Sequence, residues 1–267
     1  MKRAIVFVAV LLCASMASAA VPLPYSSGFE SDALGSAAGW ESGYPSLVND
    51  AQPAVSAAAA SPAGGGLQGL DWVKNNDGSA RSGVSLRWNA LPSSTTGVLD
   101  VSYDFKIAQQ SSRALSFVIS GWDAANKVNL NVFNLRFDSD AADIAPGWNY
   151  LDNGNWNTFI PISDASQVVG HWFHYDAKLD AATHLVDLTI TALDAGGAGG
   201  HIVGTFQGGN PLDADMANWH GIDIFQSTPN ATSEVLIDNV SVSIVPEPVS
   251  LALAVTGLLA LATRRRS

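Results

Sequence analysis

The fold is decided by one stretch, Val98-Leu-Asp-Val-Ser-Tyr-Asp-Phe-Lys-Ile107. From Leu99 onward its odd-numbered residues are large and apolar, and its even-numbered residues are polar or charged. This period of two is typical of a β-strand that buries one face and exposes the other. The sequence therefore predicts a half-buried strand here, which needs neighbouring strands with the same pattern.

The same alternation recurs along the chain. Residues 171–180 and 186–190 flank the turn Asp180-Ala-Ala-Thr183, which predicts a hairpin. The apolar phase slips within residues 128–137, and this slip predicts a β-bulge near Val132–Phe133. Further strands are expected at residues 67–73, 83–90, 115–119, 201–206, 220–227 and 234–244. The predicted fold class is all-β, an antiparallel two-sheet jelly-roll sandwich of about eleven to thirteen strands.

The two ends of the chain differ from the body between them. Residues 1–20 contain Lys2, Arg3, an apolar stretch and a small-residue site, which together are typical of a secretory signal peptide. Residues 21–245 are expected to form the sandwich domain, and residues 246–267 a separate C-terminal signal. We expect an N-terminal signal helix and a C-terminal transmembrane helix. The apolar run of the second helix would rise about 22 Å, short of the usual hydrocarbon core.

Charge and cysteine content exclude several classes of protein. Five of the 13 basic residues lie in the two ends, whereas only Glu247 of the 24 acidic residues does. The body alone therefore carries a net charge of about −15, which excludes a nucleic-acid-binding protein. The single cysteine, Cys13, lies in the signal peptide, so no disulfide or cysteine nucleophile is expected in the body.

The C-terminal segment combines two prolines around a glutamate, an apolar run and an arginine cluster, in that order. They are Pro246-Glu247-Pro248, Val249–Thr263 and Arg264-Arg265-Arg266. The prolines favour an extended segment that a processing enzyme could grip, and the arginines would stay on the cytoplasmic side of a membrane. This arrangement resembles the PEP-CTERM sorting signal. The resemblance implies processing by an exosortase in the inner membrane of a Gram-negative bacterium, after transient anchoring there. It also implies transfer to the cell surface or extracellular matrix.

Three short motifs of the body carry a second resemblance. They are Gly28-Phe29-Glu30-Ser31, the segment 170–180 and the segment 234–242. In this order they resemble concanavalin A-like and laminin-G-like jelly rolls and related carbohydrate-binding modules. The resemblance implies a fold that hosts lectins, glycosidases and adhesion modules alike.

Asp238 is a candidate metal ligand. It shares the alternation phase of Leu236 and Val240, so we expect it to point toward the apolar side, where a carboxylate needs a partner or an ion. In the carbohydrate-binding modules that the body resembles, acidic residues near the first strand and on the last strand hold a structural calcium. Glu30 and Asp238 match those places. The alternative is that Asp238 is solvated at a sheet edge or bonded to backbone.

Residues 148–157 mix aromatic and amide side chains in a turn-rich segment. Sugar rings stack on aromatic side chains while amides bond their hydroxyls, so this segment suits a carbohydrate-binding surface. The candidate contacts are Trp148, Tyr150, Asn153 and Trp156. The alternative is that a large sandwich core absorbs these aromatics. Residues 138–143, which contain three aspartates, are predicted to form a solvated acidic loop.

Catalysis is not expected from the sequence. Glycosidases need two carboxylates flanking the scissile bond, yet the glutamates of the body, Glu30, Glu41 and Glu234, begin no paired-carboxylate run. The chain is therefore predicted to be no enzyme, but an exported surface or matrix protein that acts by adhesion or polysaccharide association. A purely structural matrix component and a cryptic glycoside hydrolase or lyase remain the alternatives.

Overall fold

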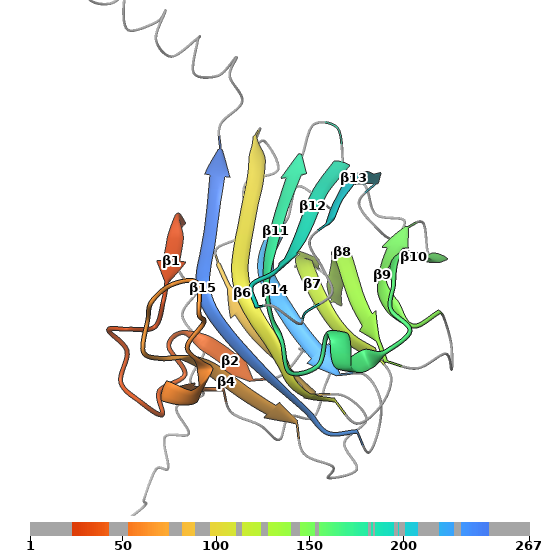
Figure 1. Ribbon diagram of the computed structural model, residues 1–267. Coiled ribbons are helices and arrows are strands. Elements are labelled where there is room, and N and C mark those ends of the chain that lie inside the picture. The colour runs from red at the N-terminus through yellow and green to blue at the C-terminus, as the bar shows by residue number, and fades with distance from the viewer. Residues whose placement is uncertain are drawn as a thin grey trace, which may run out of the picture.

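Two antiparallel β-sheets pack face to face in the structure, a computed structural model (Figure 1). It describes residues 23–42, 53–74, 82–88, 97–110, 114–123, 128–139, 145–152, 155–180, 183, 185–194, 197, 201–207, 219–226 and 231–245. The expected two-sheet antiparallel sandwich is confirmed. The predicted signal peptide and the predicted sorting segment lie outside these residues, and within the described residues no helix is long and apolar enough to cross a membrane.

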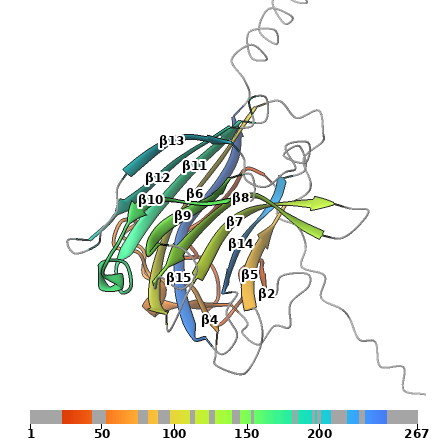
Figure 2. The ribbon, with the colours of Figure 1, turned by 90° about the vertical axis from the view of Figure 1, so that its right-hand side faces the viewer.

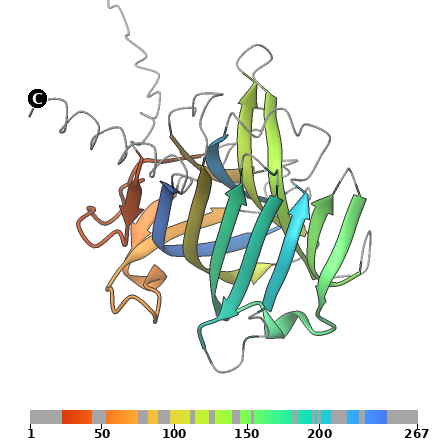
Figure 3. The ribbon, with the colours of Figure 1, turned by 90° about the horizontal axis from the view of Figure 1, so that it is seen from above.

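We call the first layer sheet I. Its strands are, in spatial order, β13 (His201–Gln207), β12 (Leu185–Ala192), β11 (Trp172–Asp180), β6 (Val98–Gln110), β15 (Ser233–Val245), β4 (Gly69–Lys74) and β3 (Ala54–Ser56). The short strand β1 (Tyr25–Ser27) pairs with the second half of β15, beside the first half that β4 occupies. Seen from above, β1 lies next to β15 (Figure 3). The stretch 98–107 is thus near the middle of the sheet, in β6.

We call the second layer sheet II (Figure 2). Its strands are β10 (Asn155–Pro161), β9 (Gly147–Asp152), β8 (Val128–Asp138), β7 (Ala114–Asp123), β14 (Trp219–Gln226), β5 (Ser82–Arg87) and β2 (Trp40–Ser42). Two single-turn 3₁₀ helices, η1 (Ala57–Ala59) and η2 (Ala165–Gln167), complete the described elements.

The core lies between the sheets and is rich in aromatic side chains. From β6, the odd-numbered residues Leu99 to Ile107 are all buried in it, as the alternation predicts. Phe105 lies 5.8 Å from Trp148 of β9 between ring centroids, and Phe173 lies 6.1 Å from Trp148. Burial of such rings supplies much of the driving force for folding.

The structure contains both the β-bulge and the hairpin that the sequence predicts. In the β7–β8 ladder, Ile119 pairs with Phe133 and Ser120 with Asn131, so Val132 is the extra residue of a bulge. The predicted hairpin is formed by β11 and β12, whose pairing ends at Asp180 and Leu185. The prediction missed β9 and β10, which form a hairpin from a segment rich in asparagine and glycine.

Candidate functional site

The outer face of sheet II, which points away from the core, is lined by polar side chains. They alternate with core residues along each strand: Asn134 of β8, for example, lies between the buried Phe133 and Leu135. We call this surface the polar face. Its members are Glu41, Ser85, Arg87, Ser116, Ser120, Asn134, Arg136, Asp138, Asn149, Trp156, Thr158 and Asp223.

Strand register places part of the polar face in one row across the sheet. Glu41 pairs with Ser85, Ser85 with Asp223, Asp223 with Val118, and Val118 with Asn134. Neighbouring strands lie about 4.8 Å apart, so this row spans roughly 19 Å from β2 to β8. Residues that are remote in the sequence thus form one continuous row, in which all members except Glu41 are less than 5% exposed.

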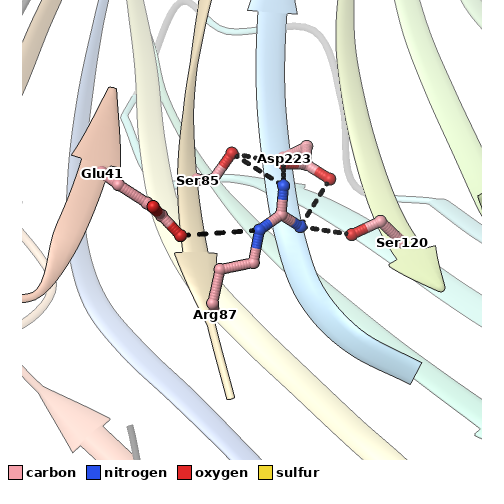
Figure 4. A network of polar contacts seen from close by, with 5 residues as sticks. All are labelled: Glu41, Ser85, Arg87, Ser120 and Asp223. Atoms are coloured by element: carbon pink, nitrogen blue, oxygen red, sulfur yellow. Dashed lines mark hydrogen bonds and ion pairs between the residues drawn. The ribbon is translucent and has the colours of Figure 1, made fainter. Parts of the chain in front are cut away.

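Arg87 is the centre of a hydrogen-bonded network at one end of the polar face (Figure 4). Its Nη2 donates to Asp223 Oδ1 at 2.7 Å and its Nη1 to Asp223 Oδ2 at 3.1 Å, a bidentate pair. Nη1 also donates to Ser120 Oγ at 2.8 Å, and the Ser85 hydroxyl donates to Asp223 Oδ1. A Cβ at Gly221 would overlap the guanidinium, so glycine is required beside it.

Arg136 organises the other end. Its Nη2 and Nε donate to Asp138 Oδ1 at 2.5 and 2.8 Å, and Asn149 Nδ2 donates to Asp138 Oδ2 at 3.0 Å. Its guanidinium carbon lies 4.8 Å from the ring centroid of Trp156 on β10. Asp138 is therefore a buried member of the polar face, and the prediction of a solvated loop was wrong at this residue. The strand register, which the sequence does not display, accounts for the difference.

Two groups of the polar face are chemically unsatisfied or perturbed. Asn134 is only 4% exposed, and its buried Oδ1 atom accepts no hydrogen bond from any residue that the structure describes. Burial raises the pKa of Glu41, an effect that the charge of Arg87 opposes and that of Asp223 reinforces. An acceptor without a donor and a carboxyl with a raised pKa are features of binding and catalytic surfaces.

The four predicted carbohydrate contacts lie in different environments in the structure. Trp148 is fully buried in the core against Phe117 and Phe137, so its ring cannot stack on a ligand from solvent. Tyr150 also packs against the core. Asn153 lies outside the described residues, while Trp156 is partly exposed on the polar face. In an antiparallel hairpin, Trp148 and Trp156 fall on opposite sides of the sheet because of the strand alternation.

Asp238 does not point toward the core. Asn239 has a positive φ of 49° and forms a bulge, so Asp238 pairs with Asp104 and faces outward from sheet I. Asp238 is nevertheless buried, and its carboxylate accepts the backbone N–H groups of Ser61 and Asn239 at 2.8 and 2.7 Å. Burial raises its pKa, and the charges of Asp104 and Glu30 add to this shift.

Glu30 is held by the loop that precedes β4. Its Oε1 atom accepts the backbone N–H groups of Leu67 at 2.8 Å and Gln68 at 3.1 Å. Across the described residues, no three or more His, Cys, Asp or Glu side chains are grouped to hold a metal. A cation near Glu30 and Asp238 would therefore need backbone carbonyls or amide oxygens as further ligands.

A polar network also surrounds Asp104 on the outer face of sheet I. His174 Nδ1 lies 2.7 Å from Asp104 Oδ1, while Ser61 Oγ and Asn239 Nδ2 both donate to Oδ2 at 2.7 Å. Burial alone would raise the pKa of Asp104, but these three bonds lower it overall. The bond to Asp104 raises the pKa of His174, and nearby Asp176 contributes in the same direction.

Stability is expected to fall as pH rises through and above the ordinary histidine pKa of about 6.5. The pKa of His174 is raised in the folded chain, so its stabilising contribution is full below that ordinary value and is lost above the raised value. The pKa of Asp104 is lowered in the folded chain, so its contribution to stability is full above the ordinary carboxyl pKa and is lost only in acid. Urea denaturation as a function of pH checks the prediction. His174→Gln should flatten the fall, with Asp176→Asn as control for the neighbouring charge. An unchanged slope in His174→Gln would show that other groups control it.

Comparisons with known proteins identify no family. No family of known sequences matches the chain, and no curated protein does. Among solved structures, the cellulose-induced protein Cip1 is 13% identical, covering 82% of this chain and 96% of its own, with a TM-score of 0.47. A carbohydrate esterase of Shiga toxin-encoding bacteriophage phi24B is 14% identical, with coverage of 83% and 97% and a TM-score of 0.48.

A third neighbour is the catalytic domain of a GH131 β-glucanase from Podospora anserina, which is 12% identical. It covers 72% of this chain and 78% of its own, with a TM-score of 0.47. Such distant likenesses assign no residue of this chain a role. The expectation that the chain is no enzyme is nevertheless corrected, because an esterase and a glucanase stand among these neighbours. Absence of a paired-glutamate run in one strand does not exclude carboxylates gathered from several strands.

Proposed function

We propose that the chain associates with polysaccharide through the polar face of sheet II. The observation that carries this proposal is Trp156, an aromatic ring left partly exposed and backed by Arg136 among amide and hydroxyl groups. Sugar C–H faces stack on such rings while neighbouring polar atoms bond the hydroxyls. Leu151 lies across the ladder from Trp156. Thr158, two residues along β10, pairs with Asn149, and its Oγ1 donates to Asn149 Oδ1 at 2.5 Å.

Trp156→Ala should weaken retention on polysaccharide by at least about tenfold, since a stacking platform is removed. Affinity electrophoresis through gels that contain a panel of soluble polysaccharides measures the effect. Leu67→Ala, which truncates an apolar side chain that is 78% exposed, is the matched control and should bind as the native chain does. Equal retention of both variants would place polysaccharide binding away from Trp156, whereas no retention of the native chain would favour a purely structural matrix component.

Hydrolysis of the bound polysaccharide is a second candidate function, favoured by Glu41. Its side chain is 37% exposed, and its raised pKa suits a general acid. Asp223, the nearest carboxylate of the row, has both oxygens occupied by Arg87. Release of reducing ends by the native chain, and its loss in Glu41→Gln, would assign this role.

The setting of this function is proposed from the two ends of the sequence. Residues 1–20 support export, and residues 246–267 support processing by an exosortase at the inner membrane. The protein would then reside at the cell surface or in the extracellular matrix of a Gram-negative bacterium. A polysaccharide-rich matrix supplies the ligand that the polar face would bind.

Calcium is proposed as a structural ion near Glu30 and Asp238. A divalent cation would offset the repulsion among Asp238, Asp104 and Glu30 that raises the Asp238 pKa. Calcium at 100 times its dissociation constant should raise the melting temperature by roughly 5–10 °C. The rise should vanish in Asp238→Ala and Glu30→Gln, and persist in Asp187→Asn. A rise that persists in both site variants would place calcium elsewhere.

A further inference from the structure

We infer that the polysaccharide bound at the polar face is uncharged, and that one of its hydroxyl groups donates to Asn134 Oδ1. This inference rests on the proposed function and specifies its ligand class. It is carried by three observations on the described part of the polar face: the pairing of its charges, the Trp156 platform, and the free acceptor of Asn134.

The charges of the described polar face are already paired with one another. Arg87 is held by Asp223, Ser85 and Ser120, and its Nε lies 3.8 Å from Glu41. Arg136 is held by Asp138 at 2.5 Å. A uronate or sulfate group would have to displace a buried internal carboxylate to reach either guanidinium, which leaves that carboxylate unpaired. The acidic body adds long-range repulsion toward a polyanion.

Asn134 supplies a hydrogen-bond acceptor for a hydroxyl group of a neutral sugar. Its neighbours across the ladder and along the strand offer no bond to Oδ1: Val118 is apolar, and Arg136 is directed to Asp138 and Trp156. A buried acceptor with no donor is unfavourable, and a bound hydroxyl would satisfy it. Trp156 lies toward the β10 edge, where Thr158 is exposed. The ligand would thus stack on the aromatic ring, and one of its hydroxyls would have to reach the deeper Asn134 amide, which is only 4% exposed.

The experiment measures binding of the full chain to soluble neutral polysaccharides (a β-glucan and a galactomannan) and to acidic ones (alginate and polygalacturonate). Neutral ligands should be retained with affinities that change less than about twofold between 50 and 500 mM salt, because no ion pair forms. Asn134→Leu should weaken that binding by about tenfold. Its melting temperature should not fall, because the amide accepts no bond that folding depends on.

The matched control is Asn157→Leu on β10, whose native amide donates to the backbone carbonyl of Asn155 and lies across the ladder from Tyr150, on the face opposite Trp156. It should bind neutral ligands as the native chain does. Salt-sensitive retention of acidic polysaccharides alone, lost in Trp156→Ala, would overturn the inference while leaving the proposed function standing. Undiminished neutral binding in Asn134→Leu would overturn the hydroxyl contact. Retention of no polysaccharide by the native chain would remove the proposed function itself.

Discussion

Arg87→Met is expected to lower the free energy of unfolding by about 3–5 kcal/mol. The guanidinium side chain is 11% exposed and its partner Asp223 is 1% exposed, so the variant leaves a buried carboxylate without its counter-charge. Of the described residues, Ser85 would then be the remaining side-chain donor to it. Urea denaturation followed by tryptophan fluorescence measures the loss.

Lys178→Met provides the control for this prediction. Lys178 and Asp176 form an exposed pair at 3.8 Å, and such pairs contribute at most about 1 kcal/mol. The double variant Arg87→Met with Asp223→Leu should recover most of the lost stability, because both buried charges are removed together. A double variant no more stable than Arg87→Met would show that the loss arises from packing and not from the unpaired charge.

Trp148→Ala should destabilise the fold by about 3–5 kcal/mol, because the ring fills the centre of the aromatic core. Its centroid lies 5.1 Å from that of Phe137 and 6.0 Å from that of Phe117. Thermal and urea denaturation measure the change. Trp156→Ala removes the same side chain from the opposite face of the same hairpin, and should change stability by less than about 1 kcal/mol.

The pair also separates stability from binding. Trp148→Ala should bind polysaccharide normally at temperatures where it stays folded, whereas Trp156→Ala should stay folded and fail to bind. Trp156→Ala destabilised as strongly as Trp148→Ala would mean that both rings are structural, and would leave the polar face without its platform.

Strands with strict alternation could be predicted from the sequence because their pattern depends on one strand alone. β6 and β11 bury their apolar side chains against one core, so each strand shows the period of two by itself. β9 also alternates, with Trp148 and Tyr150 on one side and Asn149 and Leu151 on the other. Its asparagine and glycine content made the segment resemble a turn-rich loop, and the hairpin was missed.

The polar face could not be predicted because lateral register creates it. Each strand contributes only a few polar residues, such as Ser85 and Arg87 on β5 or Asn134 and Arg136 on β8. Nothing in one strand says which residue of another lies beside it. The sequence signal that could have indicated this face is a set of strands whose non-core side is polar but lacks lysine, whereas an ordinary solvated face usually contains lysine.

The direction of Asp238 depended on a single residue. Plain alternation through residues 236–244 turns its side chain inward, and the bulge at Asn239 turns it outward beside Asp104. One extra residue in a strand places the side chains before it on the opposite face from the one that plain alternation with the side chains after it would give. The partner strand determines where such a bulge is accommodated, so the sequence of β15 alone was insufficient.

The position of β15 has a consequence for the order in which the chain can fold. This last described strand lies in the interior of sheet I, bonded to β6 on one edge and to β4 and β1 on the other. A nascent chain that has emerged only to residue 232 exposes two long unpaired edges, which invite aggregation. Sheet I therefore becomes continuous only after β15 has been synthesised, and until then a chaperone or translocation partner would meet its strands in two separate groups.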